Sequence, residues 1–415
     1  FVRGFGRGCA IGVVVTFFAV ITTIPLACSG WLGNSIHKGH EHDLVGHGLK
    51  RFGWLIEFVL RHAKLVSAVA VLATLLFGIG AARLRPDDRM QDSQPTGSEA
   101  YQVLAHCDKA IGGIEFVRVR IEWDAAANAD SEQILTAIQD VERSLKDEPS
   151  LRHPLSILNI LASFPGDESV TNRLAFLELL PEKTRASYLD TEARVAEVTV
   201  RIQDLGIAHY EPVFRRVERR LSELQAKHPG FVLTLTGDPV TRGRNLHRIV
   251  TDLASSLGTA VITIFIVMAL AYRSLRIGLI TLIPNLFPLV VTAYMMVLFG
   301  HPLEIASVCA FTVCLGIAVD DTIHFLTQYR SELDRHGNVE TALRDAFQGV
   351  GSAMIITTFI LITGFGTVLT SDLPGQRYFA AMAVSTIAAA LVGDLVFLPA
   401  LLATFSRERH TKWYR

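Results

Sequence analysis

The sequence predicts a polytopic α-helical membrane protein that carries one α+β domain outside the membrane. Three observations support this fold class. Half of the 415 residues are hydrophobic and the mean hydropathy is +0.35, which is more apolar than a soluble protein. Charged residues still make up 19%, which is too many for a chain made of membrane spans alone. Finally, long apolar runs flank one long stretch of mixed composition, residues 83–248.

Seven apolar runs are long enough to form membrane helices. They lie at 9–28, 65–82, 253–271, 277–299, 303–326, 350–370 and 378–405. The fourth run contains Pro284 and Pro288, so we expect a kinked helix whose freed carbonyl groups find other partners. Most flanking Lys and Arg residues fall on one side of the membrane, which we therefore expect to be cytoplasmic. The short loops 300–302 and 371–377 then lie on the outer side, together with the mixed stretch.

The mixed stretch 83–248 has the pattern of a small α+β sandwich of the βαββαβ, ferredoxin-like type. Alternating apolar and polar residues predict strands, and amphipathic patterns predict helices. The strands are expected at 114–123, 193–202 and 231–235, and the helices at 131–146, with Ser131 as N-cap, and at 211–227. The middle, 151–190, is less legible, and 155–164 fits either a helix or a strand.

Residues 29–64 are expected to form a cytoplasmic linker whose second half, 49–64, is an amphipathic helix on the membrane surface. The linker also holds four histidines that are candidate metal ligands: His37, His40, His42 and His47. The alternative is a polar loop rich in Gly and His. The loop is favoured because structural metal sites need defined ligand spacing, which this cluster lacks.

The five cysteines and the net charge exclude other classes. Only Cys107 lies in the polar stretch, so no disulfide framework is expected, and there is no CxxC zinc pattern. The net charge is −1, so the chain has no basic field that would attract nucleic acid.

The beginning of the sequence resembles its end. When Pro25 is placed on Pro399, Arg3 falls on Arg377 and Phe5 on Phe379. This fits a transporter built from two repeats. Because Phe1 leads straight into an apolar run, we expect the chain to lack an N-terminal half. The expected segments are 1–28 (last span of the first repeat), 29–64 (linker), 65–82 (first span of the second repeat), 83–248 (outer domain), 249–405 (five-span bundle) and 406–415 (cytoplasmic tail).

Two adjacent acids, Asp320 and Asp321, lie in the fifth apolar run. Ionised carboxylates are costly in a membrane, so such residues usually face a cavity or a partner and have a function. His324 lies on the same helical face, one turn further on, and completes a candidate proton relay. Gly316, one turn earlier, would allow another helix to approach closely. The alternative is that the acids simply mark the cytoplasmic end of the span.

Asp394 is a second intramembrane acid and a further candidate for the relay. Thr357 and Thr358, in the preceding span, are candidates to hydrogen-bond the acids or to line a water path. The alternative for these threonines is ordinary bonding to the backbone of their own helix.

The string Gly316-Ile-Ala-Val-Asp320-Asp321-Thr-Ile-His324-Phe resembles the GxxxDD motif of the resistance–nodulation–division (RND) superfamily. It is most similar to the predicted exporters of the MMPL and hopanoid-transporter type, to which Patched and Dispatched are related. Gly364-Phe365-Gly366 and the stretch from Asp394 to Pro399 also look similar to that family. The order of spans and outer domain is that of the second half of such a protein, preceded by the last span of the first half.

This resemblance implies a secondary transporter, not an enzyme, that exports hydrophobic or lipid-like molecules. It would lie in the bacterial inner membrane and use the proton gradient in place of a cofactor. Asp320 and Asp321 match the proton-coupling acids of the motif. The expected partners are membrane lipid, the exported molecule, the missing N-terminal half and, as an open alternative, further copies of the chain.

Two other functions are alternatives for a chain of this kind. A sterol- or lipid-sensing regulatory protein of the same architecture would not need Asp320 and Asp321 for its activity. An intramembrane aspartyl protease is disfavoured because Asp394 and the Pro399-Ala-Leu string lie on one helix, whereas two catalytic acids must face each other from different helices.

Overall fold

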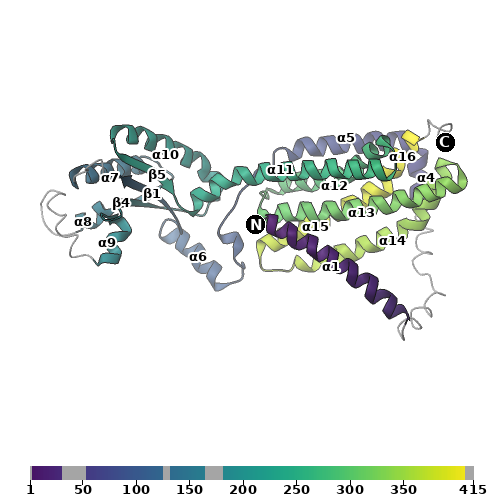
Figure 1. Cartoon of the computed structure of the whole chain (residues 1–415), viewed down its shortest axis with the longest axis horizontal. Coiled ribbons are helices and arrows are strands. Elements are labelled where there is room, and N and C mark those ends of the chain that lie inside the picture. The colour runs from purple at the N-terminus through teal and green to yellow at the C-terminus, as the bar shows by residue number, and fades with distance from the viewer. Residues whose placement is uncertain (1, 30–52, 125–130, 164–180, 407–415) are drawn as a thin grey trace.

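The computed structural model describes residues 2–29, 53–124, 131–163 and 181–406. It consists of a mixed domain, on the left in Figure 1, and a bundle of long helices on the right. Helix α11 (Asp238–Ala271) leaves the last strand of the domain and continues without a break into the bundle. The described residues therefore form one α+β region and one region of long helices.

The domain is built on an antiparallel sheet with the strand order β2-β4-β1-β5, and β3 also pairs with β4. Its strands are β1 (Glu115–Trp123), β2 (Arg152–Leu155), β3 (Leu189–Asp190), β4 (Val195–Ile202) and β5 (Phe231–Thr236). Alternate side chains of β1 and β4 are buried, as the two-residue period of a half-buried strand requires. The buried face packs on helices α7 (Ser131–Lys146) and α10 (Ile207–Lys227) in one core.

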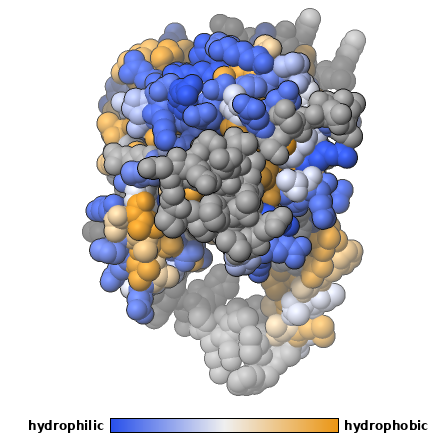
Figure 2. Space-filling model, turned by 90° about the vertical axis from the view of Figure 1, so that its left-hand side faces the viewer, coloured by the Kyte–Doolittle hydropathy of each residue, from blue (hydrophilic) through white to orange (hydrophobic). Residues whose placement is uncertain are grey.

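The segment that the sequence left open contains both kinds of element. Strand β2 ends at Leu155, and Ser156 then caps the short helix α8 (Ile157–Ala162) by accepting a hydrogen bond from the Leu158 N–H. Helix α9 (Glu182–Tyr188) follows further on. Two other elements lie between the bundle and β1, a single 3₁₀ turn (Gln91–Ser93) and helix α6 (Glu99–Ala110). Seen from the domain end, hydrophilic residues dominate the upper part of the surface, as expected for a domain in water (Figure 2).

The membrane region makes this a multi-pass membrane protein. Its helices are α1 (Val2–Ser29), α4 (Gly53–Arg61), α5 (Ala63–Ala81), α11, α12 (Leu275–Phe299), α13 (Ile305–His336), α14 (Val339–Val368), α15 (Pro374–Val392) and α16 (Leu398–Ser406). Among the described residues, six helical stretches are long and apolar enough to cross a membrane. The predicted span 253–271 corresponds to a shorter apolar stretch, Ser255–Ala271, at the end of α11.

The described part of the linker is a short amphipathic helix, α4, but its apolar face does not simply face lipid. Ile56 and Val59 are fully buried against the bundle, and Glu57 forms an ion pair with Arg344 of α14. Trp54 and Phe58 remain exposed. The prediction of an amphipathic helix is therefore correct in kind, but the bundle covers part of its apolar surface. The four linker histidines lie outside the described residues.

The domain and the bundle are joined by backbone hydrogen bonds as well as by α11. The Leu303 N–H donates to the Arg85 carbonyl at 2.9 Å, and the Thr96 N–H donates to the Asp372 carbonyl at 2.9 Å. The short loops near 300–302 and 371–377 thus lie at the domain end of the bundle, where the predicted topology puts them.

A buried ion pair anchors the start of α11 to the sheet. The Arg242 guanidinium contacts Glu115 of β1 and also donates to Asp88 at 3.0 Å. The Glu115 side chain is 5% exposed, so burial raises the pKa of its carboxyl, while Arg242 opposes this shift. The buried carboxylate of Glu115 therefore depends on Arg242 as its counter-charge.

We expect Arg242→Leu to destabilise the protein, because it leaves Glu115 buried without a cation. Removing one partner of a buried pair costs about 3–5 kcal/mol, and the partial exposure of Arg242 places the expected loss near the lower limit. Thermal unfolding of the purified protein in detergent measures the effect. Arg120→Leu is the matched control, because Arg120 pairs with Glu122 on an exposed surface and should change little. Equal melting temperatures for the two variants would contradict the prediction.

Candidate functional site

The structure separates the four predicted relay residues into two groups. On α13, Asp320 and His324 form a pair, with 3.7 Å between Asp320 Oδ1 and His324 Nε2. Their side chains are 72% and 66% exposed in this chain, so they point away from the bundle. Asp394, by contrast, is only 1% exposed and lies inside it. Asp321 is partly buried and close enough to interact electrostatically with both Asp320 and Asp394.

Asp394 is held in an unusual piece of backbone. Residues Gly393–Phe397 form a π-helical turn between α15 and α16, a local geometry that is frequent at functional sites. Gly393 lies directly against α12, where an added Cβ would come within 2.8 Å of the Pro284 carbonyl oxygen. That carbonyl is free because Pro288, four residues later, has no N–H to donate to it. The small Gly393 is thus what lets the turn with Asp394 lie against α12 at this point.

A hydrogen bond fixes the Asp394 carboxyl to the helix that carries the acid pair. The Thr322 hydroxyl on α13 is fully buried and lies 2.5 Å from Asp394 Oδ1, to which it donates. Asn285 of α12 is also buried beside it, with its Oδ1 3.4 Å from the Thr322 hydroxyl and its amide donating to the Thr281 carbonyl at 2.7 Å. Three elements therefore meet in one buried polar cluster: Thr281 and Asn285 of α12, Thr322 of α13, and Asp394.

Two of the predicted supporting residues, Gly316 and Thr357, do not make the contacts predicted for them. An added Cβ on Gly316 would meet nothing within 4 Å, so the expected close helix approach at this glycine does not occur among the described residues. The reason is that Gly316 lies on the exposed face of α13, together with Asp320. Thr357 is exposed and donates to the carbonyl groups of Ala353 and Met354, which is the ordinary backbone bonding of a helical threonine. Thr358 is buried in α14.

Two members of this buried polar cluster, Thr322 and Asn285, were not among the site residues predicted from the sequence. The sequence carried a signal for each. Asn285 is an amide in an apolar run beside two prolines, and Thr322 directly follows Asp321. Neither signal says which partner the side chain meets, because Thr322 and Asp394 are 72 residues apart.

A second feature lies where the domain meets the bundle. A cavity of about 400 Å³ is lined by charged groups, among them Arg83, Arg85 and Arg89 with Asp87 and Asp92. A smaller pocket of about 110 Å³ adjoins it between α12 and α15 and is mostly apolar. The two share three lining residues: His301, Pro302 and Tyr378. A polar space thus opens beside an apolar one at the domain end of the bundle.

These observations define a multi-pass membrane protein with a buried acid in its bundle and an α+β domain beside a polar cavity and an apolar pocket. The chain belongs to the MMPL family, whose model matches residues 124–415. The resemblance read from Gly316 to His324 is thereby confirmed at the level of the family.

Individual relatives are distant. The chain is 22% identical over 360 residues to a protein described as a membrane protein of Methanocaldococcus jannaschii, covering 83% of this chain and 91% of the relative. It is 26% identical over 205 residues to the hopanoid transporter of Burkholderia multivorans, covering 49% of this chain and 23% of that protein. A hopanoid transporter of Rhodopseudomonas palustris is 27% identical over 175 residues, or 42% and 19% of the two chains. The chain therefore spans less than a quarter of each hopanoid transporter.

We expect Thr322→Val to lower the stability of the bundle, because valine keeps the shape of threonine but leaves the buried Asp394 oxygen without its donor. A buried polar group that loses its partner costs about 1–3 kcal/mol. The melting temperature of the purified protein in detergent reports this loss. Thr357→Val is the matched control, since Thr357 is exposed and bonds only to its own helix. If both variants melt like the wild type, the hydrogen bond to Asp394 does not stabilise the bundle.

Glu304, at the junction between domain and bundle, should make the stability depend on pH. Burial, followed by the nearby carboxylates of Asp92, Asp88 and Asp87, raises the pKa of Glu304 to about 7. Between the ordinary pKa near 4.5 and pH 7, the folded protein keeps a proton that the unfolded chain has released. Stability is therefore expected to fall as the pH rises through this window and to change no further above it.

The measurement compares melting temperatures of the wild type and Glu304→Gln from pH 4.5 to 8. The glutamine cannot ionise, so the variant should lose much of the decline that the wild type shows. Glu223→Gln, on the exposed surface of α10, serves as the control. Identical pH profiles for wild type and Glu304→Gln would disprove the assignment.

Proposed function

We propose that this chain belongs to a secondary transporter that exports lipid-like molecules and is driven by the proton gradient. The observation that carries the proposal is the buried Asp394 carboxyl, which Thr322 holds against the helix of Asp320 and Asp321. An acid buried in an apolar membrane bundle is costly and is retained where it has a function. The two relatives named hopanoid transporters support a lipid-like substrate.

The proposed coupling path follows the acids across α13. Asp320 and His324 would exchange a proton with water on one side, and Asp321 would pass it toward Asp394. Protonation of Asp394 removes its negative charge. It also changes the hydrogen bond with Thr322, because a neutral carboxyl can itself donate, whereas the ionised carboxylate can only accept. The contact between α13 and the π-helical turn would then differ between the two protonation states, which is the kind of two-state element that coupling requires. No cofactor is part of this proposal.

The cavity at the outer junction supports an amphipathic substrate. Its arginines suit a polar or anionic head group, and the adjoining pocket of Thr292, Met296 and Phe299 suits an apolar portion. A molecule that reaches both spaces would pass the shared residues His301 and Tyr378. We propose this pair of spaces as a station on the export path between the membrane and the outer domain.

The same proposal includes the division of the chain. Residues 1–28 would be the last span of a first repeat, 29–64 the cytoplasmic linker, and 65–82 the first span of the second repeat. Residues 83–248 would form the extracytoplasmic domain, and 249–405 a five-span bundle. The strand order β2-β4-β1-β5 supports a βαββαβ, ferredoxin-like domain, and the apolar end of α11 supports a seventh span.

The exposed acid pair also supports a partner within the membrane. Asp320, His324 and Gly316 form one exposed face of α13, and charged side chains facing lipid are expensive. We propose that the N-terminal half of the complete transporter covers this face. The small Gly316 would then allow the close helix approach that the described residues do not provide.

We expect the double substitution Asp320→Asn and Asp321→Asn in the full-length protein to abolish export without loss of folding, because the amides cannot carry protons. Efflux of a fluorescently labelled triterpenoid lipid from vesicles with an imposed pH gradient measures transport, and size-exclusion chromatography measures folding. Asp334→Asn, an exposed acid near the end of the same helix, is the control. Unchanged efflux in the double variant would reject the proton relay, whereas a lipid-sensing protein that does not pump would show no efflux in the wild type either.

A further inference from the structure

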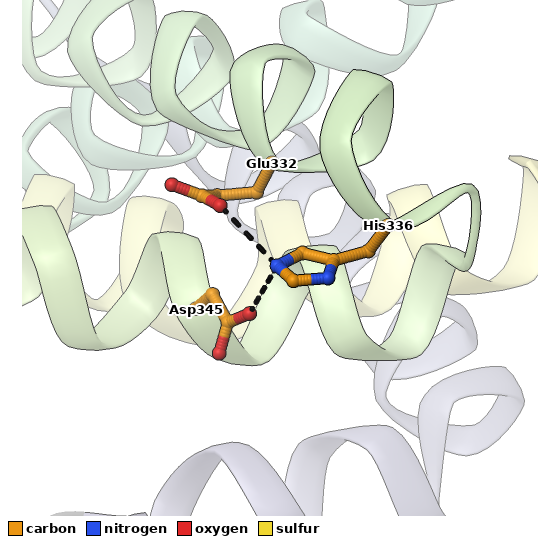
Figure 3. Close-up of side chains that lie close together, drawn as sticks. All are labelled: Glu332, His336 and Asp345. Carbon is orange, nitrogen blue, oxygen red and sulfur yellow. Dashed lines mark ion pairs between the residues drawn. The ribbon is translucent and has the colours of Figure 1, made fainter.

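A cluster of three candidate metal ligands lies at the turn between α13 and α14. His336 Nε2 is 3.6 Å from Glu332 Oε2 and 3.2 Å from Asp345 Oδ2, and one ligand atom from each of the three residues lies within 4.8 Å of the others. Figure 3 shows both carboxylates directed at the same imidazole nitrogen, Glu332 and His336 from α13 and Asp345 from α14. The cluster lies about three helical turns beyond the acid pair and plays no part in the proposed transport mechanism.

The local sequence explains how the three side chains meet. Glu332 and His336 are four residues apart and so lie on one face of α13. The helix ends at Gly337, whose φ of 65° reverses the chain in a way that L-residues disfavour. Asn338 then caps α14 by accepting hydrogen bonds from the N–H groups of Glu340 and Thr341. This tight connection brings Asp345, in the second turn of α14, beside the end of α13.

The Glu332 carboxylate is oriented by its surroundings. Glu332 is only 6% exposed. Its Oε1 accepts a hydrogen bond from Gln328 Nε2 at 2.7 Å and contacts Arg335 at 3.3 Å. These contacts leave Oε2 directed at His336. The fixed carboxylate and its supporting partners resemble the arrangement of outer groups that orient ligands around metal ions.

Ion pairs alone do not account well for this arrangement of the three side chains. Both carboxylates approach the single Nε2 atom of His336, and one N–H can make a well-directed hydrogen bond to only one of them. A metal ion between the three atoms would contact all of them. Bonds of about 2.0–2.2 Å from oxygen and nitrogen to a divalent ion place neighbouring ligand atoms about 2.8–3.6 Å apart. The two measured distances lie at or within these limits.

We propose that Glu332, His336 and Asp345 bind a divalent transition-metal ion, with Zn²⁺ the best fit. An imidazole favours Zn²⁺ and similar ions over Mg²⁺ or Ca²⁺, which prefer oxygen ligands alone. Three protein ligands leave room for water at the remaining positions. The ion would fasten the end of α13 to α14 and so restrain the helix that carries Asp320 and Asp321. Metal binding by these three residues does not require transport, so this proposal does not depend on the function proposed above.

The test measures Zn²⁺ binding to the purified protein in detergent. The four linker histidines could bind metal themselves, so the experiment uses a background in which His37, His40, His42 and His47 are all replaced by alanine. Isothermal titration with Zn²⁺ should then give one site per chain. His336→Ala and Asp345→Asn should each weaken binding by at least about tenfold, whereas Asp334→Asn, an exposed acid on the same helix, should not.

Thermal unfolding separates a metal site from an ion-pair cluster. Binding to the folded state raises the melting temperature, so Zn²⁺ should stabilise the background protein and the Asp334→Asn control but not His336→Ala. Asp345 is partly exposed, and size-exclusion chromatography of Asp345→Asn shows whether a loss of binding occurs in a folded protein. No saturable Zn²⁺ binding in the background protein, or equal affinity in the His336→Ala variant, would overturn the proposal. A variant that melts earlier, with no effect of Zn²⁺ on any protein, would show an ion-pair cluster instead.

Discussion

The hydrogen bond between Thr322 and Asp394 is the interaction on which the arrangement of the bundle depends. An acid in this position has no water to solvate it, so a neighbouring helix must supply the donor. Thr322 does so from α13, and Asn285 of α12 completes the cluster. Gly393 lies against the carbonyl of Pro284, which Pro288 leaves free. The prolines of α12, the π-helical turn and the acid are therefore parts of one solution to the burial of a polar group.

The sequence predicted the features that follow from the order of residue types along the chain. Asp320, Asp321 and Asp394 were found because acids in apolar runs are rare, and the strands of the outer domain because their side chains alternate. The GxxxDD string indicated the family, which the family match confirms. The order of elements likewise followed from the spacing of apolar and mixed stretches.

Other features depend on which helix faces lie together, and the sequence does not contain that information directly. Thr322 also lies 3.2 Å from the Ala318 carbonyl of its own helix, the ordinary contact of a helical threonine, and only the fold brings Asp394 beside it. The close helix approach predicted at Gly316 is not seen among the described residues, because none of them covers that face of α13. The Glu332, His336 and Asp345 cluster was missed since its third member lies on the next helix. The span 253–271 also merges into a longer helix that starts in the domain.

That longer helix, α11, has a mechanical consequence. Its 34 residues form a rod of about 50 Å that begins at the sheet, where Arg242 ties it to Glu115, and ends inside the bundle at Ala271. A rigid rod works as a lever, so a tilt of about 10° at the membrane end moves the other end by about 9 Å. The hydrogen bond between Leu303 and Arg85 supplies a second attachment. The hydrogen bond between Thr96 and Asp372 supplies a third, so a tilt of α11 would have to shift the domain against both hydrogen-bonded loops.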